Sequence, residues 1–364
     1  MNDTAFREQV REWLRANAPR LSSVDTAEGF EAHREWERAL AAQRLSAVAW
    51  PSRYGGRDAS LTQWLIFEEE YYAASAPVRV NQNGLFLLAP TLFAHGTEEQ
   101  RDRILPRIAT AEQVWAQAWS EPGAGSDLAA IRSTAAAVDG GFVLNGQKTW
   151  SSRAAFADRG FGLFRTGQDR HHGLTYVMFD LRAPEVTIRP IAQLNGETGF
   201  AEIFLDDVFV PSEDVIGEVG QGWRVAMSTA GHERGLSLRS PGRFLASARR
   251  LVELWRSVGS PASSAEDVAE AWIGARAYHF HTLEMVDRLA SGERLGVESS
   301  LGKVFWSELD VGLHESAMRL LGERAELRGE WSSAYLFSLA GPVYAGTNEI
   351  QKNVIAERLL GLPR

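Results

Sequence analysis

The sequence predicts an α+β protein in which a β domain separates two helical domains. Apolar residues recur at the helical period from Asp3 to about Thr110 and again from Gly222 onward, whereas the period between Val114 and Val219 is two. A chain of 364 residues is long enough for several domains with a sizeable core. We therefore expect an N-terminal helical domain at residues 1–112, an antiparallel β domain at 113–220 and a C-terminal helical domain at 221–364.

The first domain is expected to be mostly helical. One apolar face of its first helix carries Phe6, Val10, Trp13 and Leu14. The next two helices are expected over Glu28 to Arg44 and over Leu61 to Ala74. The last begins after Thr97, because Thr97-Glu98-Glu99-Gln100 fits a capping box, and Pro106 is expected to end or kink it.

Short β-rich segments separated by Gly, Asp and Pro define the middle domain. They lie at residues 142–144, 162–164, 175–179, 186–188 and 202–205. The last domain is expected to begin with one long helix from Trp223 to about Ser257, kinked at Pro241. Further helices are expected over Ala265 to Ala290, Ser299 to Leu321 and Ile350 to Leu360.

A glycine- and serine-rich loop at the start of the β domain is the first candidate for a ligand site. It reads Ser120-Glu121-Pro122-Gly123-Ala124-Gly125-Ser126-Asp127. Its glycines let a backbone approach a ligand closely, and its serines add hydroxyl donors. We expect Asn145-Gly146 to form a hairpin turn that brings Trp150-Ser151-Ser152 near this loop. The loop lacks the GxGxxG fingerprint, and taken alone it is also typical of a plain turn between strands.

The loop and the strand after it resemble the flavin-binding core of the acyl-CoA dehydrogenase family. There a Thr/Ser-Glu-Pro-x-x-Gly-Ser-Asp loop precedes Asn-Gly-x-Lys-x-(Trp/Phe)-(Ile/Ser)-(Thr/Ser), and both halves are present here in that order. The resemblance covers nearly the whole chain and implies the acyl-CoA dehydrogenase-like fold, with a C-terminal four-helix bundle. It implies FAD as the cofactor and a substrate contact at Ser126. The flavin contacts that it implies in the β domain are Gln117, Trp119, Ser120, Trp150 and Ser152.

A second resemblance to this family lies near the C-terminus. The segment Tyr344-Ala345-Gly346-Thr347-Asn348-Glu349-Ile350-Gln351 is similar to the family's Tyr-(Glu/Gly)-Gly-Thr-x-(Gln/Glu)-Ile-Gln. The residues themselves predict a turn at Gly346 and a helix capped by Thr347, which is either a ligand site or a plain cap. The resemblance implies cofactor contacts at Thr347 and Glu349, and a backbone N–H of Ala345 that holds the thioester oxygen.

The catalytic base is expected on a different helix. Many family members carry a glutamate before the glycine of this second motif, where this chain has Ala345, which cannot take a proton. Other members carry it on the first long helix of the C-terminal domain, just before an arginine, and Gly231-His232-Glu233-Arg234-Gly235 is similar to that arrangement. The resemblance therefore implies Glu233 as the base and Arg234 as its support or a substrate contact. A Glu-Arg pair taken alone is more typical of a solvated helix face.

One segment of the family pattern is missing. Members usually carry Arg-x-x-Phe-Gly after the first C-terminal helix, and its arginine reaches the flavin pyrophosphate of a neighbouring subunit. Residues 256–264 read RSVGSPASS instead. This departure resembles bacterial members that act as heterotetramers, some of them on sterol side chains. We therefore expect an oligomer, a dimer or a tetramer, made of identical or of unlike chains.

The composition excludes several other functions. A net charge of −9 gives no attraction to nucleic acid or to anionic lipid, and no apolar run approaches the roughly 18 residues that a membrane span needs. Without cysteine the chain has no disulfide, thiolate metal site or cysteine nucleophile. The eight histidines form no set with the spacing of metal ligands. We expect a cytoplasmic protein without a metal, a membrane or a nucleic-acid partner.

These observations lead to one main hypothesis and two alternatives. The main hypothesis is FAD-dependent α,β-dehydrogenation of an acyl-CoA or carrier-protein thioester, with electron-transfer flavoprotein as the acceptor. The first alternative is flavin oxidase or monooxygenase chemistry on the same fold. The second is a partner subunit with an incomplete flavin site of its own.

Overall fold

The computed structural model describes residues 2–234, 240–293 and 296–363. Contacts among them divide the chain into two compact units. The bundle unit comprises Met1–Ala18, Ala59–Ala76 and Arg234–Arg364, and the sheet unit comprises Pro19–Asp58 and Pro77–Glu233. Each unit is therefore assembled from segments that lie far apart in the sequence.

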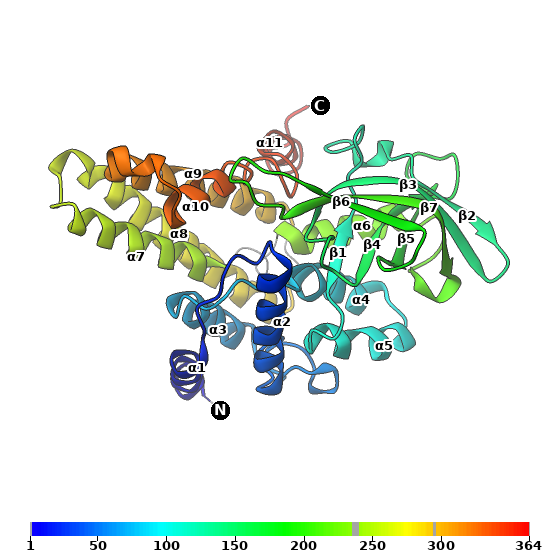
Figure 1. The fold of residues 1–364 in the computed structure, drawn as a ribbon, viewed down its shortest axis with the longest axis horizontal. Helices are drawn as coiled ribbons and strands as arrows, with labels where there is room; N and C mark the ends of the chain where they lie inside the picture. The colour runs from blue at the N-terminus through cyan, green and yellow to red at the C-terminus, as the bar shows by residue number, and fades with distance from the viewer. Residues whose placement is uncertain (1, 235–239, 294–295, 364) are drawn as a thin grey trace. The chain divides into compact units, whose positions relative to one another are not determined.

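The sheet unit is built on one eight-stranded sheet (Figure 1). Its strands are β1 (Trp115–Ala118), β2 (Thr134–Val138), β3 (Gly141–Ser152), β4 (Arg159–Arg165), β5 (Leu174–Asp180), β6 (Val186–Ile191), β7 (Phe200–Pro211) and β8 (Val215–Ile216). The order is β6-β7-β3-β2-β4-β5-β8, with β1 paired to β4. Most neighbours are antiparallel, as predicted, whereas β1 and β2 pair with β4 in parallel.

The helices of the sheet unit precede and follow the strands. They are α2 (Ala27–Ala42), α4 (Ala89–His95), α5 (Glu98–Ala109) and α6 (Gly222–Arg234), of which the last ends at the boundary of the unit. In Figure 1, α4 and α5 lie side by side next to the sheet. The capping box predicted at Thr97 is confirmed. Of the two outcomes predicted for Pro106, an end or a kink of the helix, the end was wrong, because Pro106 lies inside α5, which continues to Ala109.

The predicted hairpin turn at Asn145-Gly146 was wrong. Strand β3 runs through both residues, and the turn that joins it to β2 lies at Asp139-Gly140. Asn145 and Gly146 form a bulge against β7, because the Asn145 side chain exchanges hydrogen bonds with Asp207, at 2.7 and 3.0 Å. Gly146 has φ +145°, and an added Cβ would lie 2.2 Å from the Ser133 hydroxyl. The glycine is therefore required by a close approach within the sheet.

The bundle unit is helical. Its helices are α1 (Asp3–Asn17), α3 (Leu61–Ala73), α7 (Pro241–Ser257), α8 (Ala265–Ala290), α9 (Glu298–Leu321), α10 (Glu330–Ser338) and α11 (Asn348–Val354). Helices α7, α8 and α9 pack against one another, as Figure 1 shows. The single helix expected from Trp223 to Ser257 was wrong, because Ser240 is not helical and caps a new helix whose first residue is Pro241. Proline, which has no N–H, fits there because the N–H of the first helical residue has no acceptor within the helix.

Short helical turns complete the chain. The 3₁₀ turns are Ser52–Tyr54, Leu128–Ala130, Ser212–Asp214, Ala262–Ser264 and Gly322–Glu326, and the π-helical turns are Gly84–Leu88 and Ile355–Leu359. Each unit has its own apolar core, in which alternate strand residues or one helical face are buried. The sheet core includes Ala116, Leu144, Phe164, Val177 and Ile203, and the bundle core includes Phe244, Leu251, Tyr278, Trp306 and Leu313.

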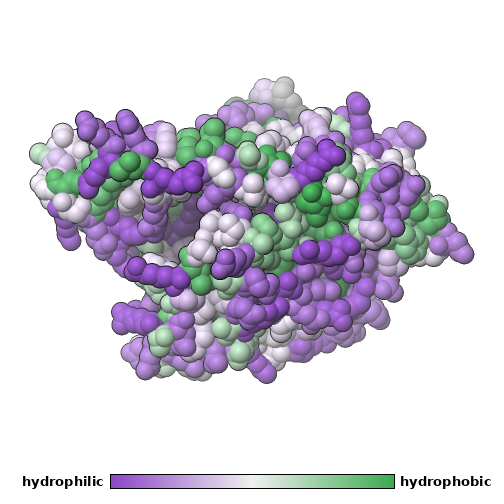
Figure 2. All heavy atoms as spheres, viewed as in Figure 1, coloured by the Kyte–Doolittle hydropathy of each residue, from purple (hydrophilic) through white to green (hydrophobic). Residues whose placement is uncertain are grey.

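The surface is that of a charged protein. The face seen in Figure 2 is mostly hydrophilic, with apolar residues in scattered patches. Among the described residues no helix is both long and apolar enough to cross a membrane.

Candidate functional site

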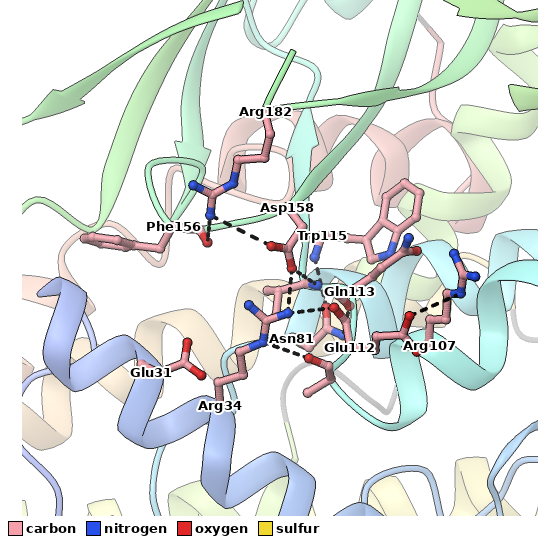
Figure 3. A network of polar contacts seen from close by, with 12 residues as sticks. Glu31, Arg34, Asn81, Arg107, Glu112, Gln113, Trp115, Phe156, Asp158 and Arg182 are labelled. Carbon is pink, nitrogen blue, oxygen red and sulfur yellow. Dashed lines mark hydrogen bonds and ion pairs between the residues drawn. The ribbon is translucent and has the colours of Figure 1, made fainter. Parts of the chain in front are cut away.

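Strand β1 carries the predicted cofactor residue Gln117, Trp119 follows directly after it, and the start of the strand is fixed by a polar network (Figure 3). The Arg34 guanidinium on α2 donates to the Asp158 carboxylate at 3.0 Å, and that carboxylate accepts the Val114 N–H at 2.8 Å. The Asn81 amide oxygen accepts the Trp115 N–H at 3.0 Å. Because these contacts hold the backbone at the start of β1, the side chains further along the strand have a defined position.

Three polar side-chain groups near the end of β1 and on β3 are buried without a hydrogen-bond partner among the described residues. They are the Gln117 Nε2, the Trp119 Nε1 and the Ser151 hydroxyl. Residues 117 and 119 are two apart, so their side chains leave the chain on the same side, and β1 contacts β3. Buried polar groups of folded proteins are nearly always satisfied, so the unsatisfied donors of Gln117 and Trp119, on one side of the chain, indicate a ligand with acceptor atoms.

A buried ion pair joins the two halves of the first motif. The Lys148 ammonium on β3 is 0% exposed and lies 2.9 Å from the Glu121 carboxylate of the loop. That carboxylate also accepts the backbone N–H groups of Arg132 at 2.6 Å and Ser133 at 2.9 Å, while Lys148 donates to the Leu163 carbonyl at 2.7 Å. The pair therefore fixes the loop against two strands of the sheet.

Burial and charge act on this pair in opposite directions. Burial lowers the pKa of Lys148 to about 8, although the Glu121 charge favours its protonated form. For Glu121, burial acts to raise the pKa, but the Lys148 charge and the hydrogen bonds from Lys148, Ser133 and Arg132 overcome it. The pKa of Glu121 consequently lies below its ordinary value, and both groups are ionised at neutral pH.

Trp150 is placed by a second bulge in β3. The register against β7 shifts between Lys148 and Ser151, and Trp150 has φ +60°, in the left-handed region. Its ring is 60% exposed and meets Phe200 edge-on at 6.2 Å. Beside it, the Thr149 N–H donates to the Ser120 carbonyl at 2.9 Å, so the loop and this strand lie next to each other. A large aromatic side chain held outward in an unfavourable conformation is typical of a ligand-contacting residue.

The outer part of the loop is open. Added Cβ atoms at Gly123 and Gly125 would meet nothing within 4 Å, and Ser126 is exposed. Exposed Asp127 pairs with Arg170 at 2.6 Å. The loop therefore offers backbone and hydroxyl groups to a ligand without steric obstruction.

The predicted C-terminal turn is confirmed in the bundle unit. Ala345 and Gly346 are both left-handed, with φ +58° and +79°, and the Thr347 hydroxyl caps α11 by accepting the Ile350 N–H at 3.2 Å. The Gln351 side-chain amide donates to the Ala345 carbonyl at 3.2 Å. Glu349 is exposed in the first turn of α11. An alanine in the left-handed region costs roughly 1 kcal/mol, so its surroundings hold it there.

The predicted base is placed only by its backbone. Glu233 and Arg234 lie in the last turn of α6, and their side chains fall outside the described part of the structure. Thr229, one turn earlier on the same face, is buried and bonds Thr91 at 2.7 Å and Tyr176 at 3.3 Å through its hydroxyl. These contacts set the rotation of α6 about its axis.

The sheet unit thus brings together Gln117, Trp119, Ser120, Trp150 and Ser152, since β1, the loop and β3 are neighbours. Thr347, Glu349 and Ala345 lie together in the bundle unit. The sequence reasoning gave no role to Glu121, Lys148 or Ser151. The opposite charges in the two halves of the motif were the signal that could have identified the ion pair.

The sheet-unit residues fit the flavin that the first motif implies. A flavin ring is aromatic and carries carbonyl and nitrogen acceptors, which match the exposed Trp150 ring and the unsatisfied donors of Gln117 and Trp119. No group of three or more His, Cys, Asp or Glu side chains suited to a metal ion occurs among the described residues.

Comparison with known families gives matches along the whole chain. The N-terminal, middle and C-terminal domains of acyl-CoA dehydrogenases match residues 2–112, 116–208 and 220–360. An acyl-CoA dehydrogenase of Mycobacterium tuberculosis, IpdE1, is 41% identical over 99% of this chain and 97% of its own length. FadE34 of the same organism is 35% identical over 90% of this chain and 46% of its own length.

Solved structures of similar fold include two complexes. The ChsE4-ChsE5 complex of Mycobacterium tuberculosis has a TM-score of 0.84 at 28% identity and covers 100% of this chain and 98% of the matched one. The Tcur3481-Tcur3483 steroid ACAD has a TM-score of 0.90 at 24% identity, with 100% and 98% covered, and shows the similarity of fold alone.

Proposed function

Because the chain belongs to the acyl-CoA dehydrogenase family, whose members are FAD-dependent oxidoreductases, we propose that it converts an acyl-CoA to its trans-2-enoyl-CoA with Glu233 as the base. The observation that carries the proposal is the pair of unsatisfied buried donors at Gln117 and Trp119, next to the loop that lies against the strand of the exposed Trp150. FAD, when bound, supplies the acceptor for the hydride from the β-carbon.

The sheet unit supplies the cofactor contacts in this proposal. Gln117, Trp119 and Ser120 donate to acceptor atoms of the flavin from β1 and the loop. Trp150 and Ser152 contact it from β3, and the Glu121–Lys148 ion pair keeps the loop and the strand in register. Thr347 and Glu349 are proposed as contacts of the C-terminal turn, and Ser126 as a substrate contact in the open part of the loop.

Glu233 is proposed to take the proton from the α-carbon of the thioester. The α-proton of a thioester is weakly acidic, so a positioned base is needed while the developing enolate oxygen is stabilised. Ala345 cannot act as the base, but its backbone N–H can donate to that oxygen. As the α-proton moves to the Glu233 carboxylate and the β-hydride leaves, the two carbons form a double bond. Arg234 is proposed to support the base or the substrate.

The visible spectrum of the purified protein tests this function. We expect bound flavin, and anaerobic addition of the correct acyl-CoA is expected to bleach its absorbance near neutral pH. The panel of acyl-CoAs should include short chains, long chains and ring-containing acyl groups. In Glu233→Gln the flavin is expected to stay bound while the bleaching rate falls by about 10³-fold or more, because a general base contributes on that order.

Glu218→Gln is the matched control, since Glu218 is an exposed carboxylate just before α6 and outside the proposed site. It is expected to bleach at the wild-type rate. Equal rates in Glu233→Gln and Glu218→Gln would remove Glu233 from the mechanism. Rapid turnover with oxygen alone would favour an oxidase over a dehydrogenase that uses electron-transfer flavoprotein.

We propose as a second candidate that the chain is one subunit of a heteromeric acyl-CoA dehydrogenase. The absence of an Arg-x-x-Phe-Gly motif from residues 256–264 favours it, because an arginine is a strong donor to phosphate. The similarity to the ChsE4-ChsE5 complex supports it. A flavin-free protein that acquires flavin only when co-expressed with a second chain would favour this candidate. Full flavin occupancy in the chain expressed alone would exclude an incomplete site.

A further inference from the structure

A fully buried lysine lies beneath the C-terminal turn and has no role in the reaction proposed above. Lys303 on α9 is 0% exposed. Its ammonium donates to the Asn348 side-chain oxygen at 2.7 Å and to the Pro342 carbonyl at 3.1 Å. Pro342 lies just before the turn Tyr344–Thr347, and Asn348 lies just after it. One side chain of α9 therefore joins both ends of the turn.

The same ends are joined by further contacts. The Asn348 N–H donates to the Pro342 carbonyl at 2.8 Å, and the Ser307 hydroxyl, one helical turn after Lys303, donates to the Asn348 side-chain oxygen at 3.0 Å. The Tyr344 ring stacks on Trp306 of the same helix with centroids 5.9 Å apart. Helix α9 thus contacts Pro342 just before the turn, Tyr344 at its first position and Asn348 just after it.

These contacts explain why Ala345 keeps an unfavourable conformation. An L-residue at φ +58° lies about 1 kcal/mol or more above its preferred regions, and it stays there only when its neighbours are fixed. A buried ammonium is costly unless its donors find acceptors, so Lys303 strongly favours the arrangement that supplies Pro342 and Asn348 to it. The direction of the Ala345 N–H is consequently tied to Lys303.

We propose that Lys303 is a positioning residue that, through Pro342 and Asn348, holds the Tyr344–Thr347 turn in the conformation that aims the Ala345 N–H. This inference extends the proposed function, in which that N–H donates to the thioester oxygen. Lys303 acts through the turn and has no direct role in proton or hydride transfer. Its removal is therefore expected to lower the rate of the chemical step while leaving Glu233 in place.

Lys303→Met tests the proposal, because methionine retains the length and apolar stem of lysine without the donors. In hydrogen exchange we expect the amides of residues 343–349 to exchange about tenfold faster or more than in the wild type. With flavin bound, the rate of flavin bleaching by acyl-CoA is expected to fall about 10- to 100-fold, the range for a misplaced donor to the thioester oxygen.

Leu313→Ala is the matched control on the same helix. Leu313 is buried in the bundle core at a distance of ten residues from Lys303, and its truncation loosens α9 generally. We expect it to lower the melting temperature without changing exchange at residues 343–349 or the bleaching rate per folded molecule. Equal effects of Lys303→Met and Leu313→Ala on exchange at residues 343–349 and on the bleaching rate would show that Lys303 only stabilises the fold. That result would overturn the proposal.

Variants of Asn348 keep the test decisive if Lys303→Met does not fold. Asn348→Asp retains an acceptor for Lys303 and is expected to retain most of the bleaching rate, whereas Asn348→Leu removes the acceptor and is expected to reproduce the loss. Similar rates in the two variants would contradict the proposal. The exchange measurement needs no substrate, so a wild-type protein with a protected turn and no dehydrogenation would reject the proposed function and leave the role of Lys303 in the turn intact.

Discussion

The two motifs, the Ser120–Asp127 loop with strand β3 (the first region) and the Tyr344–Thr347 turn (the second region), are each anchored by a fully buried lysine. The two lysines have different partners. Lys148 binds the carboxylate of Glu121, whose oxygens also accept two backbone N–H groups. Lys303 donates to two neutral oxygens, of Pro342 and Asn348. Loss of the lysine leaves an unpaired buried carboxylate in the first region and unsatisfied neutral acceptors in the second. We infer that Lys148 determines whether the loop forms, whereas Lys303 determines the direction of the Ala345 N–H in the turn.

The largest expected effect is on the ion pair of the sheet unit. Lys148→Met is expected to lower the free energy of unfolding by about 3–5 kcal/mol, because the Glu121 carboxylate stays charged and loses its buried partner. The double variant Glu121→Gln/Lys148→Met is expected to recover part of that loss. Chemical denaturation of the three proteins measures it. Lys303→Met is expected to cost less, about 1–3 kcal/mol, since the acceptors of its hydrogen bonds, Pro342 and Asn348, are neutral; equal costs would contradict this difference between the two lysines.

The pH dependence of stability gives the next effect. The pKa of Lys148 is about 8 in the folded protein and is ordinarily 10.5, so between these values the unfolded chain holds a proton that the folded protein has lost. The free energy of unfolding should therefore rise with pH from about 8 to 10.5, by roughly 3 kcal/mol. Lys148→Met should lack this rise relative to the wild type. An unchanged profile in the variant would mean that Lys148 does not titrate in this range.

Each region also holds one non-glycine residue in the left-handed conformation, Trp150 in the first and Ala345 in the second. Substitutions at these two positions are expected to have smaller effects on stability. Trp150→Gly relieves the backbone but loses the ring, so we expect stability without cofactor to change by less than about 1 kcal/mol. Flavin affinity is expected to fall about tenfold, as measured by titration of the apoprotein, because an aromatic contact is lost. Phe209→Ala removes another exposed ring of the same sheet and is expected to leave flavin affinity unchanged.

The smallest effect is expected at Ala345. Ala345→Gly allows the left-handed conformation without strain, at the cost of a more flexible unfolded chain, so stability should rise by about 0.5 kcal/mol. Ala345→Val should lower it by about 1–2 kcal/mol, because a β-branched residue tolerates this conformation least. Thermal unfolding of the two variants measures both changes. A stabilising valine would show that the turn is not left-handed at this position.

Local patterns in the sequence were sufficient for most helices and strands. The capping box at Thr97, the apolar face of α1 and the bounds of α8 follow from residues that are neighbours along the chain. The Asn145-Gly146 hairpin failed for the same reason, since the dipeptide is compatible with a turn or a bulge. Only the contact of Asn145 with Asp207, which lies on a distant strand, selects the bulge.

The sequence by itself determined the order of helical and β segments, the two motifs and the vacancy of a carboxylate at Ala345, because each is written in consecutive residues. Which residues hold those motifs in place depends on contacts between distant parts of the chain. Lys148 reaches Glu121 across 27 positions, and Lys303 reaches Asn348 across 45. A charged side chain becomes an anchor only when folding removes water from it and brings an acceptor from elsewhere in the chain, and neither condition can be read from its neighbours in the sequence.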